Sequence, residues 1–159
     1  MKQKTLSNWL KAIIIGAAVV GTVIYTWIIP LLGKELVSMY PEFADCYIPW
    51  LIFLILSGIP CYAALVISWK IAANIGKDKS FSLANAKLLK GISVLAASDS
   101  AFVFLGNTLF LLLNMNHPSI ILTSLFIVFL GIAISVAAAV LSHLVRKAAD
   151  LQEQSDLTI

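Results

Sequence analysis

The sequence has too little charge for a domain that folds in water. Only 12% of its 159 residues are charged, whereas 60% are hydrophobic, and the mean hydropathy is +0.97. A soluble domain is about 45–50% apolar, so this composition excludes an ordinary soluble protein and predicts a protein of the lipid bilayer. Cysteine is scarce as well. Cys46 and Cys61 are about 22 Å apart along a continuous helix, too far for a disulfide, and are expected to be free thiols.

Common enzyme motifs are also absent. The chain has no Walker A loop and no HExxH, GxSxG or CxxC sequence. Its two histidines, His117 and His143, are expected at opposite membrane faces, where they cannot share a metal ion. No basic stripe interleaved with aromatic residues is present, so direct nucleic-acid binding is not expected. We therefore expect a protein that is not an enzyme and that uses no cofactor or metal.

Four long apolar runs are present instead. Each has about 20 residues, enough for a helix to span a hydrocarbon core of about 30 Å. The runs cover residues 12–32, 48–69, 92–113 and 120–141. They predict an all-α integral membrane protein, a four-transmembrane-helix bundle that forms a single domain over residues 1–159. The first run leads into Gly33 and Lys34 without a small-x-small cleavage site, so we interpret it as a retained span.

The basic residues predict how the protein lies in the membrane. Ten of the eleven Lys and Arg residues lie before the first run, between the second and third, or after the fourth. Lys34 lies on the other side, beside Glu35, Glu42 and Asp45. Because short cytoplasmic segments carry an excess of Lys and Arg, both termini are expected to be cytoplasmic.

Asp99 is the one acid or base deep within a predicted span. On a helix, Ser100, Asn107 and Asn114 lie on the same broad side as Asp99, so we predict an intramembrane polar site that faces the bundle. An ionised carboxylate at this depth costs about 2.5–3.5 kcal/mol, so Asp99 is expected to be protonated, hydrogen-bonded or in contact with water. Two interpretations are open: a structural acid that links helices, or a functional site for a proton, an ion or a ligand.

Residues 70–91 are predicted to form a cytoplasmic loop followed by the amphipathic start of the third helix. Ser80 or Ser82 is placed to cap that helix. This segment is interpreted either as a membrane-surface helix start or as a docking surface for a cytoplasmic partner. The candidate docking residues are Lys77, Lys79, Phe81, Ser82, Asn85 and Lys87. Residues 144–159 are expected to be a cytoplasmic tail that prolongs the fourth helix.

The segment IAANIGKDKSFSLANAKLLKGIS, in a small four-helix protein with both ends inside, resembles the YoaS-like bacterial membrane proteins, a domain of unknown function. The residues that carry the resemblance are Gly76, Phe81, Ser82, Asn85, Leu88 and Leu89. The resemblance implies a multi-pass protein of the bacterial cytoplasmic membrane. Members are often encoded beside a small helix-turn-helix regulator, which implies such a regulator as a partner. No catalytic residue is carried over, and Asp99 matches no family motif.

Two functional hypotheses follow. In the first, the protein is a non-enzymatic sensor or regulatory interaction protein that responds to the membrane or a small ligand and contacts a cytoplasmic regulator. In the second, it is a transport or permeation component in which Asp99, Ser100 and Asn107 line a path for an ion or proton. The second hypothesis requires a homo-oligomer, because four helices enclose little volume. A structural subunit that occupies a partner's helices is a third option.

Overall fold

Residues 3–156 are described by the computed structural model, and all regular structure in this range is helical. The elements in chain order are α1 (Gln3–Val23), the π-helical turn η1 (Ile24–Ile28), α2 (Ile29–Met39), the 3-10 segment η2 (Pro41–Cys46), α3 (Tyr47–Ile75), α4 (Leu83–Leu112) and α5 (Pro118–Asp156). The predicted tail continues α5 as far as Asp156, and its residues 157–159 lie outside the described range, as do residues 1–2.

Within the described range, four helical segments are long and apolar enough to cross a membrane. They are Gln3–Met39, Pro41–Ile75, Leu83–Leu112 and Pro118–Ser155, and each predicted run lies inside one of them to within one residue. The all-α fold with four membrane-spanning helices is therefore confirmed. The helices are longer than the apolar runs because they continue into polar surroundings, as in the last turns of α5, which carry Arg146, Lys147 and Asp150.

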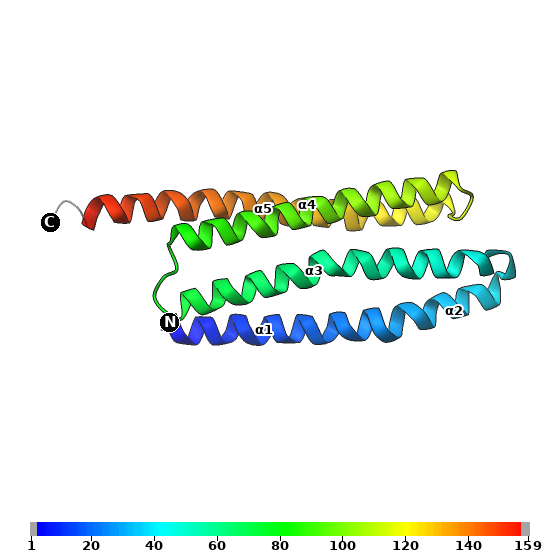
Figure 1. Ribbon diagram of the computed structural model, residues 1–159, viewed down its shortest axis with the longest axis horizontal. Helices are drawn as coiled ribbons and strands as arrows, with labels where there is room; N and C mark the ends of the chain where they lie inside the picture. Colours follow the sequence, from blue (N-terminus) through cyan, green and yellow to red (C-terminus); the bar gives the residue numbers. More distant parts are fainter. Residues whose placement is uncertain (1–2, 157–159) are drawn as a thin grey trace.

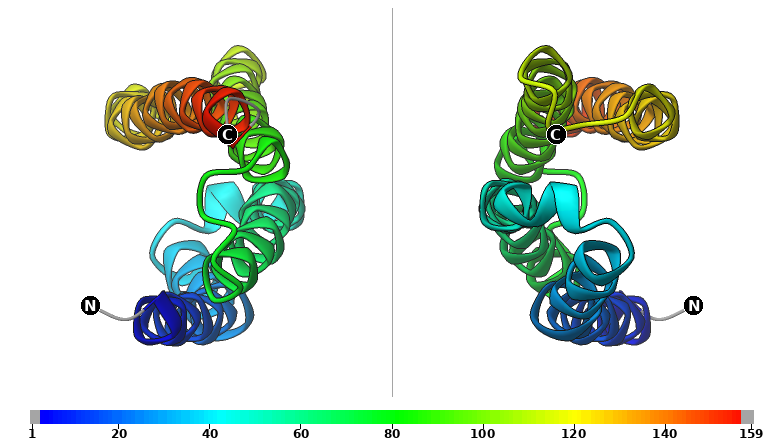
Figure 2. Two further views of the ribbon diagram at one scale, coloured as in Figure 1. Left: turned by 90° about the vertical axis from the view of Figure 1, so that its left-hand side faces the viewer. Right: turned by 90° about the vertical axis from the view of Figure 1, so that its right-hand side faces the viewer.

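The helical segments pack in series instead of around a common centre. α3 packs against α1, α4 against α3, and α5 against α4, whereas α1 and α5 share no contact in the part of the chain described. Seen end on, the segments form an open arc (Figure 2). Both chain ends lie at the same end of the molecule, as four antiparallel spans require (Figure 1). Which side of the membrane this end faces stays a prediction.

The first helical segment changes its winding just before Pro30. Proline has no N–H to donate and disturbs the helix around it. Here the preceding turn is π-helical, and the N–H of Ile29 bonds to the carbonyl of Ile24, five residues back. Such π turns are frequent at functional sites, and this one carries Tyr25. A second proline, Pro60, lies in the interior of α3, which bends about halfway along (Figure 1).

Aromatic rings pack onto glycines where neighbouring helices meet. The ring of Phe53 on α3 lies directly against Gly106 on α4. The ring of Tyr25 lies against Gly58, where an added Cβ would stand 2.9 Å from the ring. Phe53 also lies at the centre of an aromatic cluster, with ring centroids at 5.7, 5.0 and 5.3 Å from those of Trp50, Phe102 and Phe110. These contacts hold α3 against both of its neighbours.

α4 meets α5 along positions that recur every seven residues. The Ser135 hydroxyl donates to the carbonyl of Ser93 at 2.8 Å, and the Ser142 hydroxyl donates to the carbonyl of Ala86 at 2.6 Å. The α4 side of this seam consists of Ala86, Ser93, Ser100 and Asn107. A seven-residue repeat keeps one stripe of a helix turned toward its partner. This side of α4 therefore faces α5.

Candidate functional site

Asp99 lies in the middle of α4 and faces α3. Its Oδ2 atom is 4.0 Å from Sγ of Cys61, within reach of a thiol hydrogen bond. Its Oδ1 atom is buried and has no hydrogen-bond partner among residues 3–156. The nearest basic residues along the two helices, Lys70 and Lys90, are each nine positions from Cys61 or Asp99, about 14 Å along the axis. The carboxyl group therefore has no nearby cation on either helix.

Two penalties apply to this carboxyl group. An ionised carboxylate near the middle of a membrane helix costs about 2.5–3.5 kcal/mol. A buried polar atom without a partner costs about a further 1–3 kcal/mol. Asp99 therefore lowers the stability of the folded protein, and the contact with Cys61 compensates for only part of this cost. Intramembrane acids with these properties are functional-site candidates by default.

Tyr25 connects this polar group to the first helical segment. Its hydroxyl lies beside the side chains of Ser57 and Cys61, so the thiol stands between a phenol and a carboxyl group. We call these four residues, from η1, α3 and α4, the Asp99 junction: Tyr25, Ser57, Cys61 and Asp99. A second polar link lies close by, where the hydroxyls of Thr22 and Tyr62 are 2.8 Å apart.

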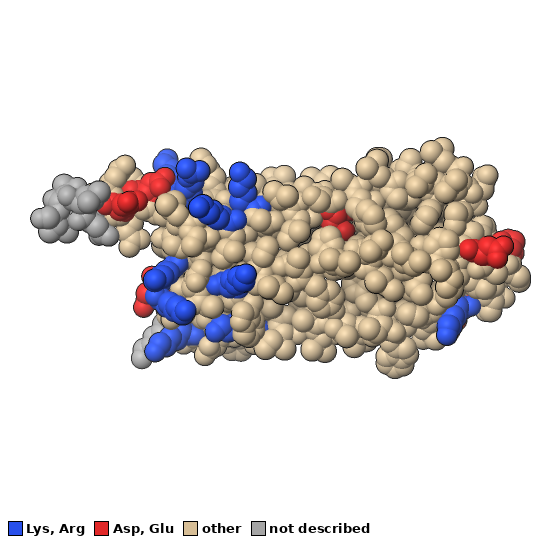
Figure 3. Space-filling model, viewed as in Figure 1, with Lys and Arg blue, Asp and Glu red and all other residues tan. Residues whose placement is uncertain are grey.

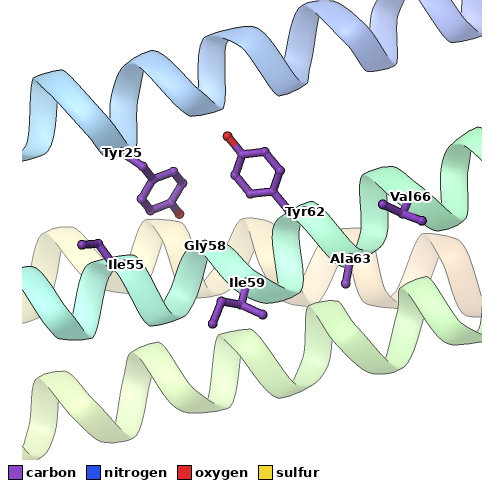
Figure 4. A pocket seen from close by; sticks show the side chains of 7 residues that line it. All are labelled: Tyr25, Ile55, Gly58, Ile59, Tyr62, Ala63 and Val66. Carbon is purple, nitrogen blue, oxygen red and sulfur yellow. The ribbon is translucent and has the colours of Figure 1, made fainter.

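A hollow of about 530 Å³ lies beside the junction, between the first helical segment and α3 (Figure 4). Its lining residues are Tyr25, Ile55, Gly58, Ile59, Tyr62, Ala63 and Val66. Tyr25 and Tyr62 point toward each other's helix from opposite sides (Figure 4), and the Tyr62 hydroxyl is already hydrogen-bonded. The surface left to the hollow is almost entirely apolar, so it suits hydrocarbon and not a water-soluble ligand.

The predicted polar set of α4 is divided between two interfaces. Ser100 packs against Gly131 of α5, and Oδ1 of Asn107 accepts a hydrogen bond from Nδ2 of Asn116 at 3.1 Å. Neighbouring positions on a helix point about 100° apart, which is why Asp99 faces α3 while Ser100 faces α5. The single polar path through Asp99, Ser100 and Asn107 is therefore not formed within one copy of the chain.

Asn114 requires a correction. It is exposed and follows the end of α4, with a φ of 56° that places it in the left-handed region. Asparagine tolerates this conformation better than most residues, and helices often end with such a residue. Its N–H bonds to the carbonyl of Leu111. Asn114 thus reverses the chain between α4 and α5 instead of contributing to an intramembrane site.

Sequence reasoning missed several residues that the fold brings to these sites. Cys61 meets Asp99 from another span, with Tyr25 of a third span beside Cys61, and Asn116 meets Asn107 while only 8% exposed. The available signal was the presence of polar side chains within apolar runs. That signal does not specify which spans are neighbours, so it predicted none of these contacts.

The two cysteines are free, as expected. Cys46 is half-buried at the start of α3, whereas Cys61 is exposed. Over the described range, no group of three or more His, Cys, Asp or Glu side chains is placed to hold a metal ion.

A second candidate site lies at the basic end of the molecule, where Lys and Arg side chains gather, apart from the mostly uncharged middle (Figure 3). The connection between α3 and α4 covers only residues 76–82, shorter than the predicted segment 70–91, because α3 runs to Ile75 and α4 begins at Leu83. The Ser82 hydroxyl accepts the N–H of Asn85 at 3.2 Å. Ser82 is therefore the N-cap of α4, one of the two serines predicted for that role.

Asn85 holds this connection in place from inside. It is 1% exposed, and its Oδ1 accepts a hydrogen bond from Nδ2 of Asn74 at 2.7 Å. Its Nδ2 donates to the carbonyls of Lys79 and Ser80, each at 3.0 Å. Asn85 is thus occupied by the fold and not free for docking, which corrects its place in the predicted docking set.

The remaining docking candidates point outward. Lys77, Lys79 and Lys87 are exposed, and Phe81 is 61% exposed. We call these four residues the basic platform. The turn is held by Asn85 and Ser82, which bind its backbone, and not by these four side chains. The platform is consequently an ordered surface with an exposed aromatic ring among three cations.

Helices of spanning length, a mostly uncharged middle and a basic end define a multi-pass helical membrane protein. The chain belongs to the family described as "Protein of unknown function (DUF2975)", whose family model matches residues 31–159. It is 31% identical over 162 residues to the "Uncharacterized membrane protein YoaS" of Bacillus subtilis (strain 168), across 99% of both chains. The resemblance to YoaS-like proteins is therefore confirmed. No solved structure matches the chain.

Proposed function

We propose that this protein is a membrane-embedded regulatory interaction protein, without catalytic activity, that binds a cytoplasmic partner at its basic end. The observation that supports this most is the basic platform. A buried asparagine orders the backbone of a short turn, while three lysines and a phenylalanine are left exposed. A turn that only connected two helices would need neither the exposed ring of Phe81 nor this internal bracing.

The chemistry of the platform indicates the kind of partner. An ordered loop loses little conformational entropy when it binds, which favours affinity. Lysines around an exposed aromatic ring complement an acidic protein surface that has an apolar pocket for the ring. The small helix-turn-helix regulators implied by the family resemblance are the first candidates. α5 extends beyond the other helices at this same end (Figure 1), so its last turns are available to the same partner.

The permeation hypothesis has less support. It requires Asp99, Ser100 and Asn107 to line one path, but these residues face two different neighbouring helices. The open arc also has no contact between its two outermost helices that would enclose a pore across the described residues.

Photo-cross-linking in living bacterial cells tests the proposal. A photoreactive phenylalanine analogue is placed at Phe81 and, as a matched control, at Leu122, which is 64% exposed at the start of α5. We expect a discrete cross-linked protein band from position 81 that position 122 does not give. Replacing Lys77 and Lys79 with glutamate should remove that band, because the charges would then repel an acidic partner.

Two outcomes would contradict the proposal. One is cross-linking of position 81 to lipid alone, which would identify the platform as a membrane-surface anchor. The other is the same set of protein bands from positions 81 and 122, which would indicate random contacts.

A further inference from the structure

We propose that the Asp99 junction is a proton-binding site. The contact between α3 and α4 is closed when Asp99 carries its proton and opens when the proton is released. The inference goes beyond the binding of a cytoplasmic partner and does not depend on it. It rests on three features: a buried carboxyl oxygen without a partner, a thiol and a phenol from two other elements beside it, and a weakened stretch of helix next to the thiol.

The surroundings of Asp99 contain no fixed positive charge. From α3 it is faced by Cys61, with Tyr62 nearby, and from η1 by Tyr25. α5 has no titratable side chain from its start at Pro118 until His143, and α4 has no other between Gly91 and its end. All of these neighbours are neutral when they carry their protons. A change in the charge of Asp99 is therefore left uncompensated within one copy of the chain.

The two protonation states require different packing. A neutral carboxyl group beside the thiol of Cys61 avoids the cost of a buried charge and keeps only the smaller cost of one oxygen without a partner. An ionised carboxylate needs several hydrogen-bond donors, yet Oδ1 has none among the described residues, and the thiol of Cys61 reaches only Oδ2. Water must supply the rest, because burial of an unpaired charge is far more costly than burial of a neutral group. Oδ1 is covered in the closed packing, and a separation of α3 and α4 at this level would admit water to it.

The backbone of α3 is weakened at this level. Pro60, directly before Cys61, has no N–H and so leaves one backbone bond of the helix unmade. The apolar hollow beside Tyr25 provides space next to the same turn. Nearer the start of α3, the aromatic cluster around Phe53 has no titratable member and holds α3 to α4 in both states. Opening is therefore confined to the junction.

Backbone hydrogen exchange measured by mass spectrometry tests this in lipid vesicles from about pH 5 to about pH 8, where an exposed aspartate is ionised throughout. The chain is compared with Asp99→Asn at each pH, so that the intrinsic effect of pH on exchange cancels. Toward the upper end we expect the stretches around Cys61 and Asp99 to exchange at least about fivefold faster than in the variant, because they open locally. The stretch around Phe53 serves as an internal control and should show no difference.

Infrared spectroscopy of the unaltered protein is the second measurement and requires no variant. The band of a protonated carboxyl group should be present at the lower end of this pH range and should disappear as the pH rises. A band that persists or is absent throughout would overturn the proposal. So would a band that titrates while the exchange around Cys61 stays equal to that of Asp99→Asn. If Asp99→Asn does not fold, Asp99→Ser takes its place in the exchange comparison.

Discussion

Asn85 and Asp99 are both polar side chains of α4 with buried polar atoms. They differ in how many hydrogen-bond partners those atoms have. Asn85 makes three side-chain hydrogen bonds that join two helices and a turn. Asp99 has one long contact with a thiol and one oxygen without a partner. A fully bonded buried group stabilises a fold, whereas a partly bonded one is a local weakness. We therefore assign a structural role to Asn85 and propose a functional one for Asp99.

Asn85→Ala should loosen the turn between α3 and α4. The substitution leaves the carbonyls of Lys79 and Ser80 and the amide of Asn74 without their partner, and we expect it to cost about 1–3 kcal/mol of stability. Trypsin should then cleave after Lys77 and Lys79 faster than in the unaltered protein. Lys87→Ala, at an exposed position two residues away, is the control and should leave this rate unchanged. Equal cleavage rates in both variants would show that Asn85 does not brace the turn.

At the scale of elements, the helices are held together by shape and not by opposite charges. Phe53 and Tyr25 fill the space that Gly106 and Gly58 leave open, and the α4–α5 seam uses serine, alanine and glycine so that the two backbones approach closely. Small residues at such interfaces are the usual means by which membrane helices associate, because lipid provides no hydrophobic driving force between them.

Gly106→Ala should weaken the contact between α3 and α4. The added methyl group would collide with the ring of Phe53, which is 6% exposed and has little room to move. Overpacking of this kind costs about 1–3 kcal/mol, and thermal unfolding in detergent should detect it. Gly16→Ala is the matched control, because a Cβ at Gly16 meets nothing within 4 Å. If both variants unfold at the same temperature, the ring of Phe53 does not determine this packing.

The sequence predicted the elements better than their contacts. Hydropathy alone located the four spans, and the preference of serine for helix N-caps pointed to Ser80 or Ser82, of which Ser82 is the cap. The π turn at Tyr25 and the separation of Asp99 from Ser100 could not be predicted in this way. Both depend on which helices are neighbours, and that depends on the fit between rings and glycines on different spans. The seven-residue spacing of Ala86, Ser93, Ser100 and Asn107 is a sequence signal for the seam.

At the scale of the whole molecule, the two proposed sites lie at different depths of one open arc. The basic platform is at the end that carries both termini, and the Asp99 junction is in the middle of the spans. α4 connects them, because its first turns carry Lys87 and its centre carries Asp99. The expectation from sequence was a four-helix bundle, with no statement about whether it is closed or open. Four similar apolar runs do not specify which helices pack together. The open arrangement could therefore not be predicted from the sequence and is seen in the structure.

A cytoplasmic partner can bind the basic platform only if the basic end of the molecule faces the cytoplasm. Thiol labelling in intact cells measures this orientation directly. With Cys46 and Cys61 replaced by serine, single cysteines are introduced at two exposed positions, Lys79 at the basic end and Glu42 at the acidic end. A membrane-impermeant maleimide should label the cysteine of Glu42→Cys in intact cells and that of Lys79→Cys only after the membrane is opened. Labelling of Lys79→Cys in intact cells, with Glu42→Cys protected, would contradict the account.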